Sequence, residues 1–224
     1  MAAGDGQHHQ SRESLAKLCQ TYWLPLYGYV RRRVSDVDQA QDLTQQFFAD
    51  LLEKNAIGAA DQTRGRFRAF LLTAFKHFLS KQWEKQRAQK RGGGKIPISL
   101  DFKAADSSLC IEPAGGLTAE QLFDQQWAVT LLERIMQRLA EEFGARGKSK
   151  QFEVLKCYIV GDHVGVSYAE VALTIATTED AAKQVVSRMR RRYRELLRDE
   201  IAQTVASPGE VEDEIAQLFT VLAL

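Results

Sequence analysis

The sequence predicts an all-α protein in which two helical domains are joined by a flexible linker. Apolar residues recur at helical spacing in nearly every segment of the 224-residue chain, and the apolar/polar alternation of a half-buried strand is missing. Only four Pro residues are available to interrupt these patterns. Between the two groups of helices lies an aperiodic, Gly-rich stretch, which is typical of a linker.

The first domain is predicted over residues 11–91. Residues 14–34 carry apolar side chains at helical spacing, and Pro25 is expected to bend or interrupt this helix. Ser35 and Asp38 have the spacing of a capping box, which predicts that a second helix begins there. A loop of Gly and small polar residues separates it from a third, longer amphipathic helix.

The linker is predicted over residues 92–117. It contains five Gly and two Pro and shows no helical period. The second domain is predicted over 118–206, where capping signals begin at Thr118, Ser167 and Thr177 and are each followed three residues later by an acid or an amide. The helices predicted in this domain span 119–143, 149–161, 168–175 and 178–198.

The composition excludes several classes of protein. No stretch is long and apolar enough to enter a membrane, and the N-terminus lacks the apolar core of a signal peptide. Cys19, Cys110 and Cys157 lie far apart, which suits free thiols in a reducing cytoplasm. No Cys/His pattern predicts a metal, no motif predicts another cofactor, and no catalytic constellation predicts an enzyme.

The helix over 178–198 separates apolar from polar side chains. Its predicted apolar face holds Ala182, Val185, Val186, Met189, Tyr193 and Leu196. Its predicted polar face holds Asp180, Gln184, Ser187, Arg188, Arg191 and Arg198. A short capped helix just before it makes the pair a candidate helix-turn-helix, in which Gln and Arg would contact base edges in the major groove. The alternative is a solvated face whose arginines pair with nearby acids.

A second basic face is predicted on the helix over 64–91. Its apolar stripe holds Phe67, Phe70, Leu71, Ala74, Phe75 and Phe78. The opposite side holds Thr73, Lys76, His77, Ser80 and Trp83. An aromatic ring among cations suits stacking on an unpaired base, although Trp83 could instead pack under the linker or against the first helix.

Two motifs, in this order, carry a family resemblance. The segments "VDQAQDLTQQFFADLLEK" and "RGRFRAFLLTAFKHFLSKQWEKQRAQKR" resemble region 2 of sigma-70 family RNA polymerase sigma factors, of the extracytoplasmic-function type. The segment "SYAEVALTIATTEDAAKQVVSRMRRRYRELL" resembles region 4. The resemblance covers about residues 14–201. It implies a transcription initiation factor that binds core RNA polymerase and promoter DNA and helps to melt the minus-ten region.

The resemblance also implies roles for particular residues. The residues that match the core-polymerase motif are Asp42, Leu43, Gln45, Gln46 and Phe47, of which the aromatic is expected to be exposed. Those that match minus-ten positions are Arg66, Lys76, His77, Ser80 and Trp83, together with the loop over 55–63. Those that match minus-thirty-five positions are Lys183, Gln184, Ser187, Arg188 and Arg191.

The sequence departs from the family pattern at several points. The usual acidic pair before "LTQ" is reduced to Gln41 and Asp42, and His77 stands where the family tends to have Asn. The turn "LTIATTED" lacks the family's Gly, and Val185 occupies a position that is usually basic. The preferred minus-thirty-five sequence therefore cannot be transferred from the family.

The C-terminal segment over 207–224 carries four acids and no base along an amphipathic helix. It is expected either to complete the core of the second domain or to fold back on that domain, or onto a regulator, and temper DNA binding. An anti-sigma factor or other regulator is a further partner to consider. The alternative function is a stand-alone helix-turn-helix transcriptional regulator, which would bind duplex DNA without polymerase.

Overall fold

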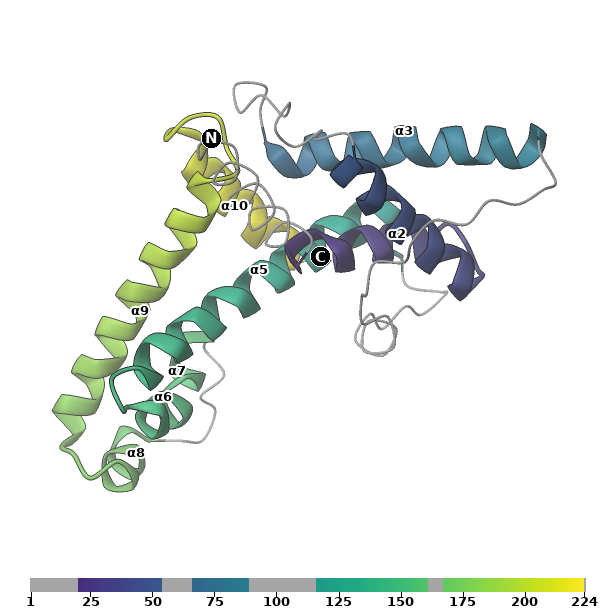
Figure 1. Cartoon of the computed structure of the whole chain (residues 1–224). Helices are drawn as coiled ribbons and strands as arrows, with labels where there is room; N and C mark the ends of the chain where they lie inside the picture. Colours follow the sequence, from purple (N-terminus) through teal and green to yellow (C-terminus); the bar gives the residue numbers. More distant parts are fainter. Residues whose placement is uncertain (1–19, 54–65, 89–115, 161–166, 224) are drawn as a thin grey trace, which may run out of the picture. The chain divides into compact units, whose positions relative to one another are not determined.

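The computed structural model describes residues 20–53, 66–88, 116–160 and 167–223 (Figure 1). Every regular element within these ranges is a helix, as the sequence predicts. Residues 20–31 are helical, and the further helices are α2 (Val37–Glu53), α3 (Phe67–Ala88), α5 (Ala119–Gly144), α6 (Ser149–Leu155), α7 (Cys157–Val160), α8 (Tyr168–Thr174), α9 (Glu179–Ala202) and α10 (Glu210–Leu222). None of the described helices has the length and apolar character of a membrane span. Nearly all of the predicted linker lies outside the described residues.

The helices divide into two compact units at places that differ from the predicted domain boundaries. Unit 1 comprises the described residues up to Thr130 together with Thr204–Leu224, and unit 2 comprises Leu131–Gln203. The division therefore falls within α5 and not in the Gly-rich stretch. Helical periodicity identified α5 correctly, but it could not tell which unit buries each of its turns.

Aromatic side chains form much of the core of unit 1. Tyr22, Tyr27 and Tyr29 of the first described helix are all 1% exposed or less. The Phe47 ring of α2 lies 4.7 Å from the Phe75 ring of α3, centroid to centroid. Rings of this size bury large apolar areas and attract one another in tilted arrangements, so these contacts hold α2 against α3.

Two local predictions about the first helices are wrong in detail. Pro25 does not interrupt the helix over 20–31, because it is buried among side chains whose packing outweighs one lost backbone hydrogen bond. Helix α2 is capped by Asp36 and not by Ser35, since the Asp36 carboxylate accepts a 3.0 Å hydrogen bond from the Gln39 amide. A carboxylate is at least as good a cap as a hydroxyl, and it also suits the positive end of the helix dipole.

A buried ion cluster joins α3 and α10 within unit 1. The Glu214 carboxylate is 1% exposed and accepts hydrogen bonds from Arg68 Nε at 2.5 Å and Nη2 at 3.3 Å. Arg66 Nε lies 2.9 Å from the same carboxylate. Arg68 also pairs with Asp124 of α5 and lies over the Trp127 ring, 4.6 Å from its centroid. These contacts place the C-terminal segment in unit 1, so it does not complete the core around α9, whereas contact with a regulator stays a prediction.

Unit 2 is built around α9. In Figure 1, helices α6, α7 and α8 gather near the end of α5 and the start of α9. Both α7 and α8 pack on α9. The buried side chains that fill this core include Phe152, Leu155, Tyr158, Val171, Val186 and Met189. The stacked rings of Tyr158 and Tyr168, 4.4 Å apart, add a contact between α7 and α8.

Glu214→Ala is expected to lower the free energy of unfolding by about 3–5 kcal/mol, because it leaves two arginines beside a buried site without their shared carboxylate. Asp213→Ala, on the exposed side of the same helix, is the matched control and should cost less than about 1 kcal/mol. Urea denaturation followed by tryptophan fluorescence measures both changes. Equal losses in the two variants would contradict a stabilising role for the cluster.

Candidate nucleic-acid interface

Helices α8 and α9 form the predicted pair of capped helices. The Ser167 hydroxyl accepts a 3.2 Å hydrogen bond from the Glu170 amide, and the Glu170 carboxylate accepts a 2.9 Å bond from the Ser167 amide. This capping box confirms the predicted start of α8, and its hydrogen bonds lower the pKa of Glu170. Helix α9 begins one residue later than predicted, because Thr178 caps it by accepting a 3.2 Å bond from the Ala181 amide.

The turn between α8 and α9 uses a left-handed residue that is not glycine. Ala176 has φ = 51°, and it is the one non-Gly residue with positive φ in the described part of the chain. The Thr177 amide donates to Ala172 O at 2.9 Å, and the Ala176 amide donates to Leu173 O at 3.3 Å. These two bonds close α8 with a Schellman motif, in which Gly is the usual residue at the left-handed position. The missing Gly therefore leaves the turn in place and adds strain to it.

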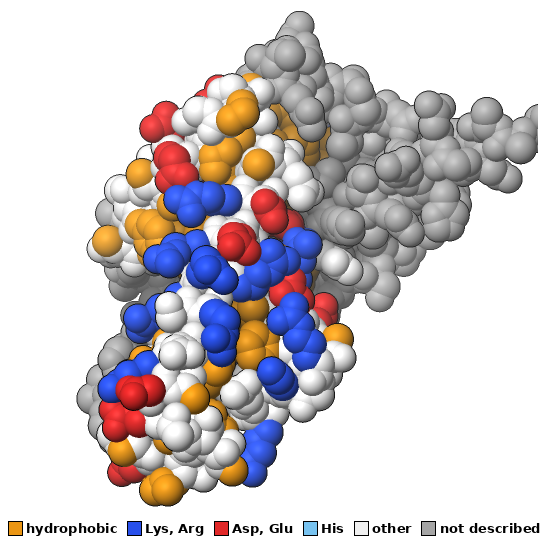
Figure 2. All heavy atoms as spheres, turned by 90° about the vertical axis from the view of Figure 1, so that its left-hand side faces the viewer, with side chains coloured by type: hydrophobic (Ala, Val, Ile, Leu, Met, Phe, Trp, Pro, Cys, Tyr) orange, Lys and Arg blue, Asp and Glu red, His pale blue; other side chains and the backbone are white. Residues whose placement is uncertain are grey.

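The polar face of α9 is exposed as predicted. Gln184, Ser187, Arg188 and Arg191 all face solvent, whereas Ala182, Val186, Met189 and Leu196 are buried. Val185 and Tyr193 are only half-buried, and burial raises the Tyr193 pKa to about 12. Figure 2 looks onto the side of the molecule where α9 lies, and Lys and Arg side chains gather along it.

Several basic residues of α9 have partners within unit 2. Arg190 donates to Tyr158 O from Nε at 3.0 Å and from Nη2 at 2.7 Å, which holds α9 on α7. Arg192 grips the Glu142 carboxylate of α5 through Nη2 at 2.8 Å and Nε at 3.0 Å, and this contact lowers the Glu142 pKa. These two arginines therefore stabilise the unit through guanidinium groups that already have partners.

Lys183, a predicted site residue, is exposed but paired. Its ammonium lies 2.6 Å from the Glu179 carboxylate one turn earlier, and this hydrogen bond raises the Lys183 pKa. An exposed pair of this kind is weak, so a phosphate could displace the carboxylate at a small cost. Arg188, in contrast, makes no hydrogen bond or ion pair with the described residues.

The predicted minus-ten residues do not converge on one site. His77 and Ser80 are exposed on α3, and Trp83 is half-buried nearby. Lys76 pairs with Glu120 at 2.8 Å, whereas Arg66 pairs with Glu214. Arg66 lies just before α3 and Lys76 ten residues further along, about 15 Å of helical rise, and each pairs with a different carboxylate.

The burial of the other α3 side chains agrees only in part with the apolar stripe predicted for this helix. Phe70, placed on the apolar face, is 41% exposed, while Leu71 and Phe75 are buried. The loop over 55–63 lies outside the described residues. The described polar face of α3 is therefore a patch of His77, Ser80 and Trp83 beside a paired Lys76.

The predicted core-polymerase residues of α2 lie on two different sides. Asp42 is exposed, and Gln45 and Gln46 are half-buried. Leu43 and Phe47 are each 3% exposed, so the expectation of an exposed aromatic is wrong. Phe47 packs on Phe75 because the aromatic core of unit 1 covers that side of α2.

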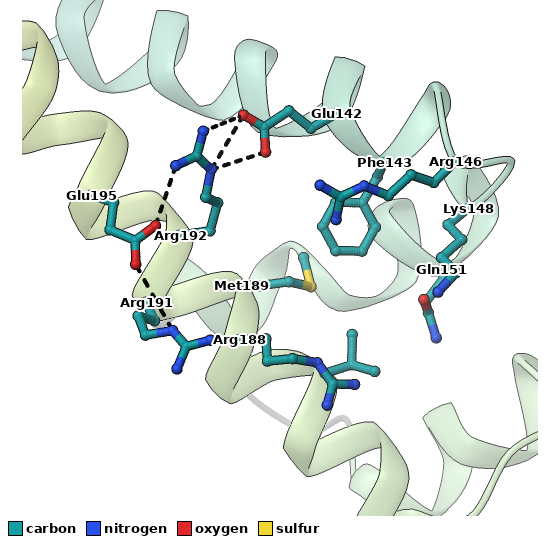
Figure 3. Close-up of a pocket in the computed structure, with 11 residues that line it drawn as sticks. Glu142, Phe143, Arg146, Lys148, Gln151, Arg188, Met189, Arg191, Arg192 and Glu195 are labelled. Atoms are coloured by element: carbon teal, nitrogen blue, oxygen red, sulfur yellow. Dashed lines mark hydrogen bonds and ion pairs between the residues drawn. The ribbon is translucent and has the colours of Figure 1, made fainter.

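A groove in unit 2 contains basic residues that the sequence analysis missed. Its space is about 220 Å³, and Arg146, Lys148 and Gln151 line it opposite Arg188 (Figure 3). The basic run between α5 and α6 was the available signal, but its side chains could not be paired with those of α9 without the fold. No group of three or more His, Cys, Asp or Glu among the described residues could hold a metal ion.

No protein-family model, curated protein or solved structure matches this chain. The functional argument consequently rests on the residues and on the geometry of the two units.

Ala176→Gly is expected to raise the free energy of unfolding by about 1 kcal/mol, because Gly adopts the left-handed conformation without strain. Ala169→Gly, in the exposed part of α8, is the matched control and should lower it by about 1 kcal/mol. Chemical denaturation measures both. A loss of stability in Ala176→Gly would contradict the strain assigned to this turn.

Proposed function

We propose that this chain is a transcription initiation factor that binds core RNA polymerase, directs it to promoters and helps to melt the minus-ten region. The observation that carries the proposal is the capped α8–turn–α9 pair with Gln184, Ser187 and Arg188 exposed on the second helix. A helix so presented can enter the major groove. The region 2 and region 4 resemblances, in their order along the chain, extend this DNA-binding role to promoter recognition.

In the proposed complex α9 reads the minus-thirty-five element. Arg188 and Gln184 would contact base edges, because guanidinium and amide groups form bidentate pairs with guanine and adenine. Arg191 would bind a phosphate, since it keeps only a 3.9 Å contact with Glu195. Lys183 would exchange its carboxylate partner for a phosphate.

The minus-ten role is proposed for the polar patch of α3. Trp83 would stack on an unpaired base, with His77 and Ser80 supplying polar contacts. Arg66 and Lys76 already have carboxylate partners, so their proposed part is to add positive potential near the strand.

Core polymerase binding is proposed for the outer side of α2. Asp42, Gln45 and Gln46 would contact the polymerase, whereas the buried Leu43 and Phe47 would hold α2 in position beneath that surface. The polymerase, in the cytoplasm, would carry out the chemistry. The proposed protein is therefore a non-enzymatic partner, and an anti-sigma factor or other regulator could act on it.

Arg188→Ala is expected to weaken promoter binding by about 1–3 kcal/mol, the value of one bidentate base contact. Arg194→Ala is the matched control, because it removes an exposed arginine from another face of the same helix. Gel shifts with the polymerase complex measure both affinities. An unchanged affinity in Arg188→Ala would remove this residue from the interface.

The function as a whole is tested by run-off transcription with purified bacterial core polymerase and promoter fragments from upstream of the protein's own gene. A specific start that requires the protein is the expected result. Absence of a transcript and of any association with core polymerase, with duplex binding retained, would reject the initiation factor and favour a stand-alone regulator.

A further inference from the structure

The groove between the α5–α6 turn and α9 has an excess of positive charge. Its lining contains five Lys and Arg side chains and two Glu side chains. Figure 3 shows Arg146 and Lys148 on the α5–α6 side of this space and Arg188 on the α9 side. Because both sides belong to unit 2, the fold of this unit alone brings these cations together.

The two carboxylates of the groove are already matched by other cations. Glu142 accepts two hydrogen bonds from Arg192, and Glu195 lies 3.2 Å from the same guanidinium and 3.9 Å from Arg191. In contrast, the side chains of Arg146, Lys148 and Arg188 form no hydrogen bond or ion pair with the described residues. Their charges therefore remain available to an anion from outside the unit.

The backbone fixes the position of the first two cations. Helix α5 ends in a Schellman motif, in which the Lys148 amide donates to Phe143 O at 2.9 Å and the Gly147 amide donates to Gly144 O at 2.9 Å. Gly147 has φ = 67°, a conformation that a residue with a side chain rarely adopts. Arg146 and Lys148 thus flank a rigid turn and not a free loop.

Apolar side chains line the space beneath these charges. Met189 is 1% exposed, and Val185 and Phe143 are half-buried. These side chains form the apolar part of the groove lining. Gln151 adds an uncharged amide that can donate a hydrogen bond.

We propose that this groove binds a backbone phosphate of duplex DNA, with Arg146 and Lys148 as the cations that hold it. The inference rests on the proposed binding of duplex DNA by α9. Arg188 belongs both to the exposed polar face of α9 and to the groove, so DNA that reaches one of them lies beside the other. A helix in the major groove has phosphates along both of its sides, and contacts to them set its orientation.

An open groove of exposed cations also favours a polymeric ligand over a small anion. Arg146, Lys148 and Arg188 are all exposed, so a free phosphate would keep most of its water and gain little. A DNA phosphate arrives already positioned by the neighbouring contacts of α9, and the groove then adds to them at a smaller entropic cost.

The test is the salt dependence of duplex binding by the full-length chain. Each phosphate contact contributes about 0.9 to the slope of log K against log salt concentration. The double variant Arg146→Gln/Lys148→Gln should reduce that slope by about 1, the share of one phosphate, and should weaken binding equally for promoter and mixed-sequence duplexes. Fluorescence anisotropy with a labelled mixed-sequence duplex measures the slope, and circular dichroism checks that the variant is folded.

Lys150→Gln is the matched control, because it removes an exposed cation of α6 that does not line the groove. Its slope should equal that of the unchanged chain. If the wild-type chain binds duplex DNA and the folded double variant shows the same slope, the groove proposal is overturned and the proposed function is left standing. Absence of duplex binding by the wild-type chain would overturn the role of α9, and the groove proposal with it.

Discussion

The two-pronged contact of Arg192 with Glu142 decides which parts of unit 2 remain available to a partner. It joins the middle of α9 to the last turns of α5, at 2.8 Å and 3.0 Å. A bidentate pair of this kind fixes both the distance and the rotation of one helix against another. In this arrangement Met189 is buried and Arg188 is exposed. The polar face of α9 lies opposite its buried apolar face, and the Arg192 contact adds to the packing that holds the helix in this orientation.

Unit 1 uses the same chemistry in a buried setting. Arg68 reaches Glu214 and Asp124, and its guanidinium lies over Trp127. The Asp124 pKa is raised because burial outweighs the attraction of Arg68. The cost of burying the two charges therefore offsets part of the free energy that their attraction contributes. The pair of Arg68 and Glu214 fixes the register of α10 against α3, since a carboxylate on α10 can pair with Arg68 at only one position along α3. The C-terminal helix is therefore attached to unit 1 by polar contacts as well as by its apolar face.

Sequence patterns predicted the helices well because local interactions decide them. The capping box at Ser167 and the two faces of α9 depend on residues within a few positions of one another. The boundary within α5 and the packing of α10 depend on partners far along the chain, such as the 146 residues between Arg68 and Glu214. Periodicity carries no information on such partners, so it could place neither the division within α5 nor the packing of α10.

The same limit applies to the candidate site. Helical projection set Gln184 and Arg188 apart from Arg190 and Arg192, but it could not show that the latter two have partners within unit 2. In the arginine-rich part of α9, some side chains thus contact other helices of the unit and others face solvent. A formal net charge of only +1 is an average over the chain, and basic side chains still gather on the exposed face of α9. The helical fold thus separates arginines that hold the unit together from arginines that face outward.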